Sequence, residues 1–168
     1  MERLRIAGTV NDSVVDGEGW RYAIFTQGCP HHCPGCHNPA THAFDGGRVV
    51  DTETLLQEIL ANPLLAGVTF SGGEPFLQPT PLAELGKAVH AHGLDVWAYT
   101  GYVYEDLRAK AENEPAVQAL LDVVDILCDG PYIEAQRDLA LPFRGSRNQR
   151  LIDIPQTRAT GTIVLHEV

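Results

Sequence analysis

The chain has 168 residues and carries 12 Lys and Arg against 22 Asp and Glu, which gives a formal net charge of −10. This acidic balance argues against sequence-independent binding to nucleic acid, which needs a positive surface. Hydrophobic residues make up 44% of the chain, as in an ordinary globular protein, and no apolar run approaches the length of a membrane span. We therefore expect a single cytoplasmic domain over residues 1–168, with no nucleic-acid partner and no membrane contact.

Short runs rich in β-branched and apolar residues predict strands, and the stretches between them predict helices. In chain order, the predicted strands cover residues 4–10, 22–26, 68–71, 94–100, 124–128 and 162–165. The predicted helices cover residues 52–60, 81–90, 104–111 and 115–121. Strands that alternate with helices indicate parallel strands joined by crossovers. Because there are too few such units for a complete barrel, the expected fold is an α/β partial, open barrel of parallel strands.

Unusual residues follow four of the predicted strands. In chain order these are a cysteine-rich loop after residue 26, Gly72-Gly73-Glu74-Pro75, Gly101, and Asp129-Gly130-Pro131. Ligands gather at the carboxyl ends of parallel strands, where such residues share one edge of the sheet. The pattern therefore predicts one site built from four strand ends.

Three of the four cysteines, Cys29, Cys33 and Cys36, are spaced C-x3-C-x2-C within eight residues. Three thiols this close together cannot all pair with one another, so a metal or cluster site is favoured over disulfides. Three thiolates saturate three irons of a four-iron cluster and leave one iron open, whereas electron-transfer clusters normally carry four cysteines. Two alternatives stay open from the residues alone: a zinc site completed by a neighbouring histidine, and an electron carrier with Cys128 as the fourth ligand.

Beyond the cysteine loop at residues 25–39, five further stretches carry a family resemblance, at residues 16–21, 70–75, 99–102, 129–132 and 141–150. The C-x3-C-x2-C spacing resembles the signature of the radical S-adenosylmethionine superfamily. The other stretches resemble a narrower group, the activating proteins of anaerobic (class III) ribonucleoside-triphosphate reductase. This resemblance covers residues 11–153, with one visible departure, because Glu18 stands where many relatives have proline.

The resemblance implies that Cys29, Cys33 and Cys36 hold a 4Fe-4S cluster whose open iron binds S-adenosylmethionine. An electron from a flavodoxin-like donor would split this cofactor into methionine and a deoxyadenosyl radical. The radical would take a hydrogen atom from a glycine of the large subunit of the anaerobic ribonucleoside-triphosphate reductase. The chain would then be an enzyme, an oxidoreductase that activates a glycyl-radical enzyme. An activase for another glycyl-radical enzyme, of the pyruvate formate-lyase type, is the alternative within this class.

The resemblance also implies which residues bind the cofactor. They are Gly35, Cys36, His37, Gly72, Gly73, Glu74, Thr100, Gly101 and Asp129. The Gly72-Gly73-Glu74 stretch resembles the element that receives the methionine amino group, although a tight strand-to-helix turn explains it equally well. Thr100 and Gly101 would lie near the ribose. Asp129 would bond the ribose hydroxyls or a neighbouring positive charge, although Asp-Gly-Pro is also ordinary turn chemistry.

The late part of the chain is locally basic. Residues 137–158 contain five arginines and two acids, Asp138 and Asp153. Such a stretch fits an acidic partner surface or an anionic ligand, and it equally fits a solvated loop paired with the acidic remainder of the chain. We expect Arg144 and Arg147 to dock the reductase.

Overall fold

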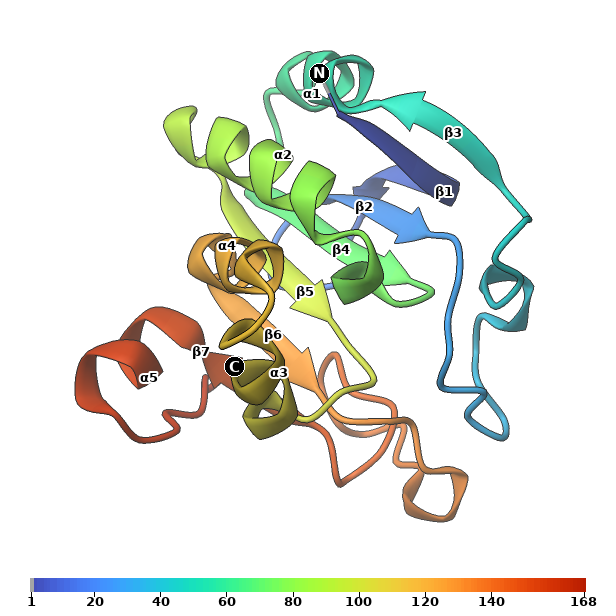
Figure 1. Cartoon of the computed structure of the whole chain (residues 1–168), viewed down its shortest axis with the longest axis vertical. Coiled ribbons are helices and arrows are strands. Elements are labelled where there is room, and N and C mark those ends of the chain that lie inside the picture. Colours follow the sequence, from blue (N-terminus) through green and yellow to red (C-terminus); the bar gives the residue numbers. More distant parts are fainter. Residues whose placement is uncertain (1) are drawn as a thin grey trace.

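The structure is a computed structural model and describes residues 2–168, whose seven strands form one sheet (Figure 1). The strands are β1 (Arg3–Ser13), β2 (Arg21–Thr26), β3 (Arg48–Asp51), β4 (Gly67–Gly72), β5 (Asp95–Tyr99), β6 (Ile126–Asp129) and β7 (Arg150–Asp153). The helices are α1 (Thr52–Leu60), α2 (Pro79–Ala91), α3 (Tyr104–Ala111), α4 (Pro115–Val123) and α5 (Ile154–Thr160). None of the helices between residues 2 and 168 has the length and apolar character that crossing a bilayer requires.

The sheet has a parallel centre and antiparallel edges, in the order β3-β1-β2-β4-β5-β6-β7. Strands β2, β4, β5 and β6 run parallel, which confirms the expected α/β class. Strands β1, β3 and β7 pair antiparallel with their neighbours. The connection from β1 to β2 covers only residues 14–20, which is too short for a crossover helix, so the chain reverses there. Within the described residues β3 and β7 lie at opposite edges, and the sheet stays open.

The two faces of the sheet carry different side chains because successive residues of a strand point to opposite sides. Val68 and Phe70 of β4 belong to the main apolar core under the helices, and both are fully buried. Helices α1, α2 and α4 lie along this face (Figure 1). At the contact between α2 and α4, a Cβ atom on Gly86 would lie 2.6 Å from Val123 Cγ2, so the absence of a side chain lets the two helices approach.

The opposite face carries a smaller apolar cluster around Trp97 and Cys128. Arg21 lies against this cluster with its guanidinium 5.4 Å from the centre of the Trp97 ring, and its side chain is fully buried. The guanidinium donates to the Thr69 hydroxyl at 2.7 Å and pairs with Asp95 at 2.5 Å. These bonds satisfy the buried charge and fix the start of β2 to the neighbouring strands.

The structure corrects the sequence prediction at the end of the chain. Residues 162–165 are expected to form a strand but join the sheet only through a single bridge between Leu165 and Ile152. The prediction is wrong because Gly161, with φ 76°, ends α5 in a left-handed turn and leaves the following residues beside the edge strand β7. Strands β3 and β7 and helix α5 are missing from the prediction, since segments this short show no clear period.

Candidate functional site

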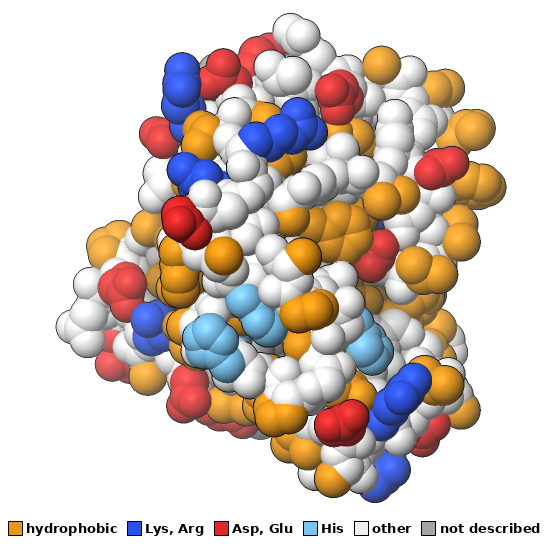
Figure 2. All heavy atoms as spheres, turned by 90° about the vertical axis from the view of Figure 1, so that its right-hand side faces the viewer, with side chains coloured by type: hydrophobic (Ala, Val, Ile, Leu, Met, Phe, Trp, Pro, Cys, Tyr) orange, Lys and Arg blue, Asp and Glu red, His pale blue; other side chains and the backbone are white. Residues whose placement is uncertain are grey.

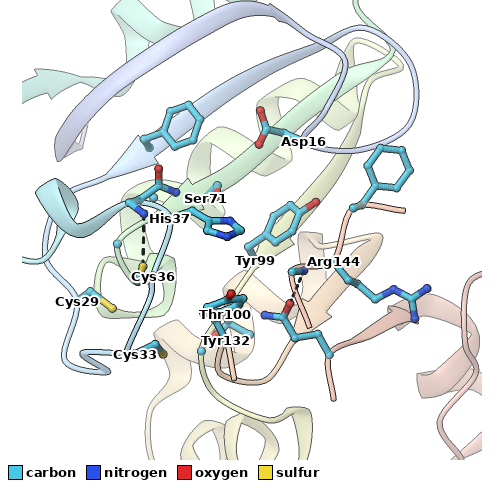
Figure 3. A pocket seen from close by; sticks show the side chains of 18 of the residues that line it. Asp16, Cys29, Cys33, Cys36, His37, Ser71, Tyr99, Thr100, Tyr132 and Arg144 are labelled. Carbon is cyan, nitrogen blue, oxygen red and sulfur yellow. Dashed lines mark hydrogen bonds between the residues drawn. The ribbon is translucent and has the colours of Figure 1, made fainter. Parts of the chain in front are cut away.

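A cavity of about 980 Å³ opens on the sheet face opposite the helices (Figure 3). Phe25 of β2, Ser71 of β4 and Tyr99 of β5 line it, each as the last or the next-to-last residue of its strand. Phe25 and Ser71 are direct neighbours in the parallel register of β2 and β4. The strand ends that the sequence places at one edge therefore surround a common cavity.

The three closely spaced cysteines all line this cavity, from the connection between β2 and β3. They are free thiols; Cys29 is buried, and Cys33 and Cys36 are half-buried. A tight turn links the last two, because the Cys36 N–H donates to the Cys33 carbonyl at 3.1 Å. The Cys36 sulfur in turn accepts the Asn38 N–H at 3.5 Å. The loop therefore brings three soft sulfur donors to one cavity from a single short segment.

Backbone hydrogen bonds fix the start of the cysteine loop to the end of β4. The Glu74 N–H donates to the Gly28 carbonyl, and the Gly73 N–H to the Thr26 carbonyl, both at 2.8 Å. A Cβ atom on Gly73 would lie 2.4 Å from the Gly28 oxygen, so this contact requires glycine. The tight strand-to-helix turn proposed for this stretch is therefore present, and it holds the cysteine loop.

Burial raises the pKa of the Cys29 thiol, and the charges of Glu74, Cys33 and Cys36 act in the same direction. A hydrogen bond from the His31 backbone partly offsets this by lowering the same pKa. A thiol in this position gains from a bound cation, which favours the thiolate. Three free thiols that line one cavity are a donor set that fits an iron–sulfur cluster.

The electron-carrier alternative, with Cys128 as a fourth ligand, finds less support in the geometry than a site of three cysteines. The fourth thiol, Cys128, does not line the cavity but packs against Trp97 in the smaller apolar cluster. Burial raises the pKa of the Cys128 thiol, as expected for a structural cysteine.

The expected cofactor-binding residues divide into two sets. Those that line the cavity are Cys36, His37, Gly72, Gly73, Thr100 and Gly101. The His37 ring lies 5.0 Å from the ring of Tyr132, another lining residue. Gly35, Glu74 and Asp129 do not line it. At Gly35 the backbone has φ 73°, and a Cβ atom there would lie 2.8 Å from the Glu134 carboxyl carbon.

The structure gives the Glu74 and Asp129 side chains partners within the chain, and for Asp129 the partner is the neighbouring positive charge that was one of its two expected roles. Both are buried with their carboxylates occupied by groups of the chain itself. Asp129 accepts the Arg150 Nε–H at 3.0 Å and the Tyr104 N–H at 2.8 Å, so it meets a neighbouring positive charge rather than the cavity. The sequence cannot show such an assignment, because Arg150 is brought to Asp129 only by the pairing of β6 with β7.

The cavity has a second end, opposite the cysteines, whose residues lie in stretches that carry the family resemblance but were not assigned to the cavity. Asp16, Tyr99 and Arg144 lie there, away from the three sulfurs (Figure 3). The Asp16 carboxylate accepts the Ser13 hydroxyl at 2.5 Å, and the buried Arg144 Nε has no hydrogen-bond partner among the described residues. Asp16 and Arg144 come from loops far apart in the sequence, and the available signals were their charge and their places in two stretches that carry the family resemblance.

Hydrophobic side chains surround the mouth of the cavity. Val14 and Val15 precede β2 and are 55% and 74% exposed, and Leu139, in the connection to β7, is 79% exposed. Figure 2 shows hydrophobic and histidine side chains together on the face that carries the cysteine loop. Large apolar residues this exposed at the rim of a cavity are typical of a surface that binds another macromolecule.

Comparisons with known proteins place these features in a family context. The chain matches a family model described as a 4Fe-4S single cluster domain over residues 15–152, a region that includes the three cavity cysteines. A protein of Salmonella typhimurium named anaerobic ribonucleoside-triphosphate reductase-activating protein is 34% identical over 146 residues, which cover 81% of this chain and 90% of that protein. A protein of the same name from Enterobacteria phage T4 is 33% identical over 144 residues, or 82% of this chain and 86% of that protein. Among solved structures, QueE from Escherichia coli aligns with a TM-score of 0.47 and 19% identity over 59% of this chain and 53% of its own.

Proposed function

The chain belongs to the family of anaerobic ribonucleoside-triphosphate reductase-activating proteins, and from this premise we propose that it installs a glycyl radical on the large subunit of that reductase. It would be an oxidoreductase of the cytoplasm that uses S-adenosylmethionine and receives its electron from a flavodoxin-like donor. The observation that carries the proposal is the convergence of three free thiols and the glycine-rich end of β4 on one cavity.

Cys29, Cys33 and Cys36 are the residues that would hold a 4Fe-4S cluster. When bound, the cluster would supply the electron for cleavage of S-adenosylmethionine into methionine and a deoxyadenosyl radical, which would take a hydrogen atom from a glycine of the reductase. Soft thiolates are the ligands that such a cluster requires, and all three cysteines line the cavity.

The remaining walls would bind the cofactor and exclude water. Gly72 and Gly73 line the cavity, and the absence of their side chains lets the backbone of β2 and of the cysteine loop pack directly against them. Phe25 and Tyr99 add aromatic surface, and burial raises the pKa of the Tyr99 phenol, so it stays neutral. A neutral, largely apolar wall protects a reactive radical from side reactions with solvent.

The partner would reach the cavity between the two loops that form its mouth. Val15 and Leu139 expose most of their side chains there, and both line the cavity. An apolar surface that is continuous with the reaction site suits a protein substrate whose glycine must enter the cavity.

The test of this function is anaerobic reconstitution with iron and sulfide, followed by reduction with dithionite. Electron paramagnetic resonance is recorded with and without S-adenosylmethionine, and deoxyadenosine is measured in the same sample. The reductase is then added, and its glycyl radical signal is measured. The Cys36→Ser variant serves as the control that should form neither deoxyadenosine nor the glycyl radical.

We expect a cluster signal that changes when S-adenosylmethionine is added, with formation of deoxyadenosine and then of the glycyl radical. A cluster signal that does not change when S-adenosylmethionine is added would overturn the proposal and favour an electron-transfer protein. Deoxyadenosine without a glycyl radical on this reductase would instead point to another glycyl-radical enzyme as the partner.

A further inference from the structure

The Glu74 carboxylate lies at the junction of three segments and has no exposed surface. It accepts hydrogen bonds from the Gly101 N–H at 2.8 Å, from the Phe76 N–H at 3.1 Å and from the Thr100 hydroxyl at 2.9 Å. The fourth donor is the His31 ring, whose Nε2 lies 2.6 Å from Glu74 Oε1. The contact is a hydrogen bond to the carboxylate in the tautomer of His31 that carries its ring hydrogen on Nε2.

His31 is the one of these donors that belongs to the cysteine loop. It stands between Cys29 and Cys33, and its ring is held edge-on against Tyr102 with 4.7 Å between the ring centres. A Cβ atom on Gly101 would lie 2.3 Å from His31 Cδ2, so the ring can reach Glu74 only because residue 101 is glycine.

His31 follows Cys29 by only two residues, so the position of its ring constrains the backbone that carries the Cys29 thiol. The ring thus connects the loop that carries a cavity-lining cysteine to a buried carboxylate at the end of β4. A side chain held at two points loses rotational freedom, and so does the backbone that carries it.

We propose that Glu74 is a positioning residue that acts through His31 to fix the Cys29–His31 segment of the cysteine loop against the ends of β4 and β5. The role of this loop as the cluster-binding element rests on the proposed function. Both oxygens of the Glu74 carboxylate already accept hydrogen bonds from the chain. The side chain therefore helps to position the cysteine loop and does not contact a ligand directly. Hydrogen bonds to a charged group are the stronger class, which suits a loop that must keep its thiols in place.

The test measures the accessibility of each thiol in the apoprotein, without iron, S-adenosylmethionine or the reductase. Reduced protein is treated with iodoacetamide under anaerobic conditions, and the alkylation rate of each cysteine is followed by fragmentation mass spectrometry of tryptic peptides. Fragmentation is needed because Cys29, Cys33 and Cys36 share the peptide of residues 22–48, whereas Cys128 lies in the peptide of residues 111–137. Because Cys128 is buried in the sheet, its rate reports any general loosening of the fold.

The variants form a matched set. His31→Asn is too short to reach Glu74, and His31→Gln restores a donor at a similar distance. His32→Asn makes the same change at the adjacent exposed histidine. We expect His31→Asn to raise the alkylation rate of Cys29 about tenfold or more, in line with the loss of a hydrogen bond to a charged group. His31→Gln and His32→Asn should alkylate at the wild-type rate, and Cys128 should be unaffected in every variant.

An unchanged Cys29 rate in His31→Asn would overturn the inference. A parallel rise at Cys29 and Cys128 would also overturn it, because the effect would then be a general loss of stability. Since the measurement uses apoprotein, its outcome is independent of whether the chain cleaves S-adenosylmethionine, and failure of one proposal is distinguishable from failure of the other.

Discussion

Arg150 and Asp129 face each other across the antiparallel pair of β6 and β7, with Arg150 Nε 3.0 Å from Asp129 Oδ1. Asp129 is almost fully buried, and its second oxygen accepts the Tyr104 N–H at the start of α3. One carboxylate therefore connects an edge strand, a central strand and a helix.

Replacing Arg150 by alanine should leave the Asp129 carboxylate buried without its charged partner. We expect Arg150→Ala to lower the free energy of unfolding of the apoprotein by about 2 to 3 kcal/mol, measured by urea denaturation. The control is Arg158→Ala, because the pair of Arg158 with Asp122 is about half exposed on both sides. That variant should lose less than about 1 kcal/mol. Equal losses in the two variants would contradict this account.

The same arginine predicts a pH dependence through Glu105. A hydrogen bond from Arg150, at 2.7 Å, lowers the pKa of Glu105 below its usual value of 4.5. Because the folded-state pKa is the lower one, the stabilisation is present above about pH 4.5 and is lost as the pH falls through the folded-state pKa. Wild type should therefore be slightly more stable than Glu105→Gln at neutral pH, and the difference should vanish in acid. A difference that grows in acid would have the wrong sign.

The close approach of Gly101 to His31 predicts coupling between the two positions. Gly101→Ala places a Cβ atom 2.3 Å from the ring and should destabilise the protein by about 1 to 3 kcal/mol. In a His31→Ala background the obstacle is gone, so the same substitution should cost much less. Urea denaturation of the four proteins of this double-mutant cycle gives the coupling energy. Additive effects would show that the clash is relieved elsewhere.

Cys128 and Cys36 should respond differently to substitution. Cys128→Ala removes a buried thiol from the smaller apolar cluster and should leave the iron content after anaerobic reconstitution unchanged, at a stability cost of about 1 kcal/mol. Cys36→Ser should lose most of the iron, because it removes a thiol that lines the cavity. Iron and sulfide analysis of both variants provides the measurement, and iron loss in Cys128→Ala would restore Cys128 as a candidate ligand.

The apolar mouth of the cavity should matter for the partner rather than for the cofactor. We expect the double variant Val15→Ser and Leu139→Ser to form deoxyadenosine at the wild-type rate without the reductase. Glycyl radical formation on the reductase should fall about tenfold or more, as for exposed apolar contacts at the centre of an interface. Leu64→Ser is the control, since Leu64 is 70% exposed and does not line the cavity. Equal loss of both activities would show that these residues serve the cofactor.

The cavity itself could be predicted from the sequence because parallel strands end at a common edge. Its position was predicted from two features, the spacing of Cys29, Cys33 and Cys36 and the glycines at the end of β4. These residues line the cavity. The functions of Glu74 and Asp129 could not be predicted in this way, because the sequence around a carboxylate at a strand end does not show which groups will contact it in the fold. Their partners His31 and Arg150 are 43 and 21 residues away in the chain.

The second end of the cavity was predicted only in part. Asp16 and Arg144 lie in stretches that carry the family resemblance, but they line the same cavity only because strands distant in the sequence pair with each other. The edge strands β3 and β7 escaped prediction because each has only two apolar residues, with a charged residue on either side. Their places are decided instead by pairing with the free edges of β1 and β6.

The contact between Gly86 and Val123 limits how this protein can be stabilised by design. Replacing a glycine within a helix by alanine is a standard stabilising choice, because alanine favours the helical backbone by about 1 kcal/mol. At residue 86 the added methyl group would have to push α2 away from α4, and these two helices cover the centre of the sheet. Stabilising substitutions should therefore be placed at the exposed positions of α1 and α3, where they leave the spacing between α2 and α4 unchanged.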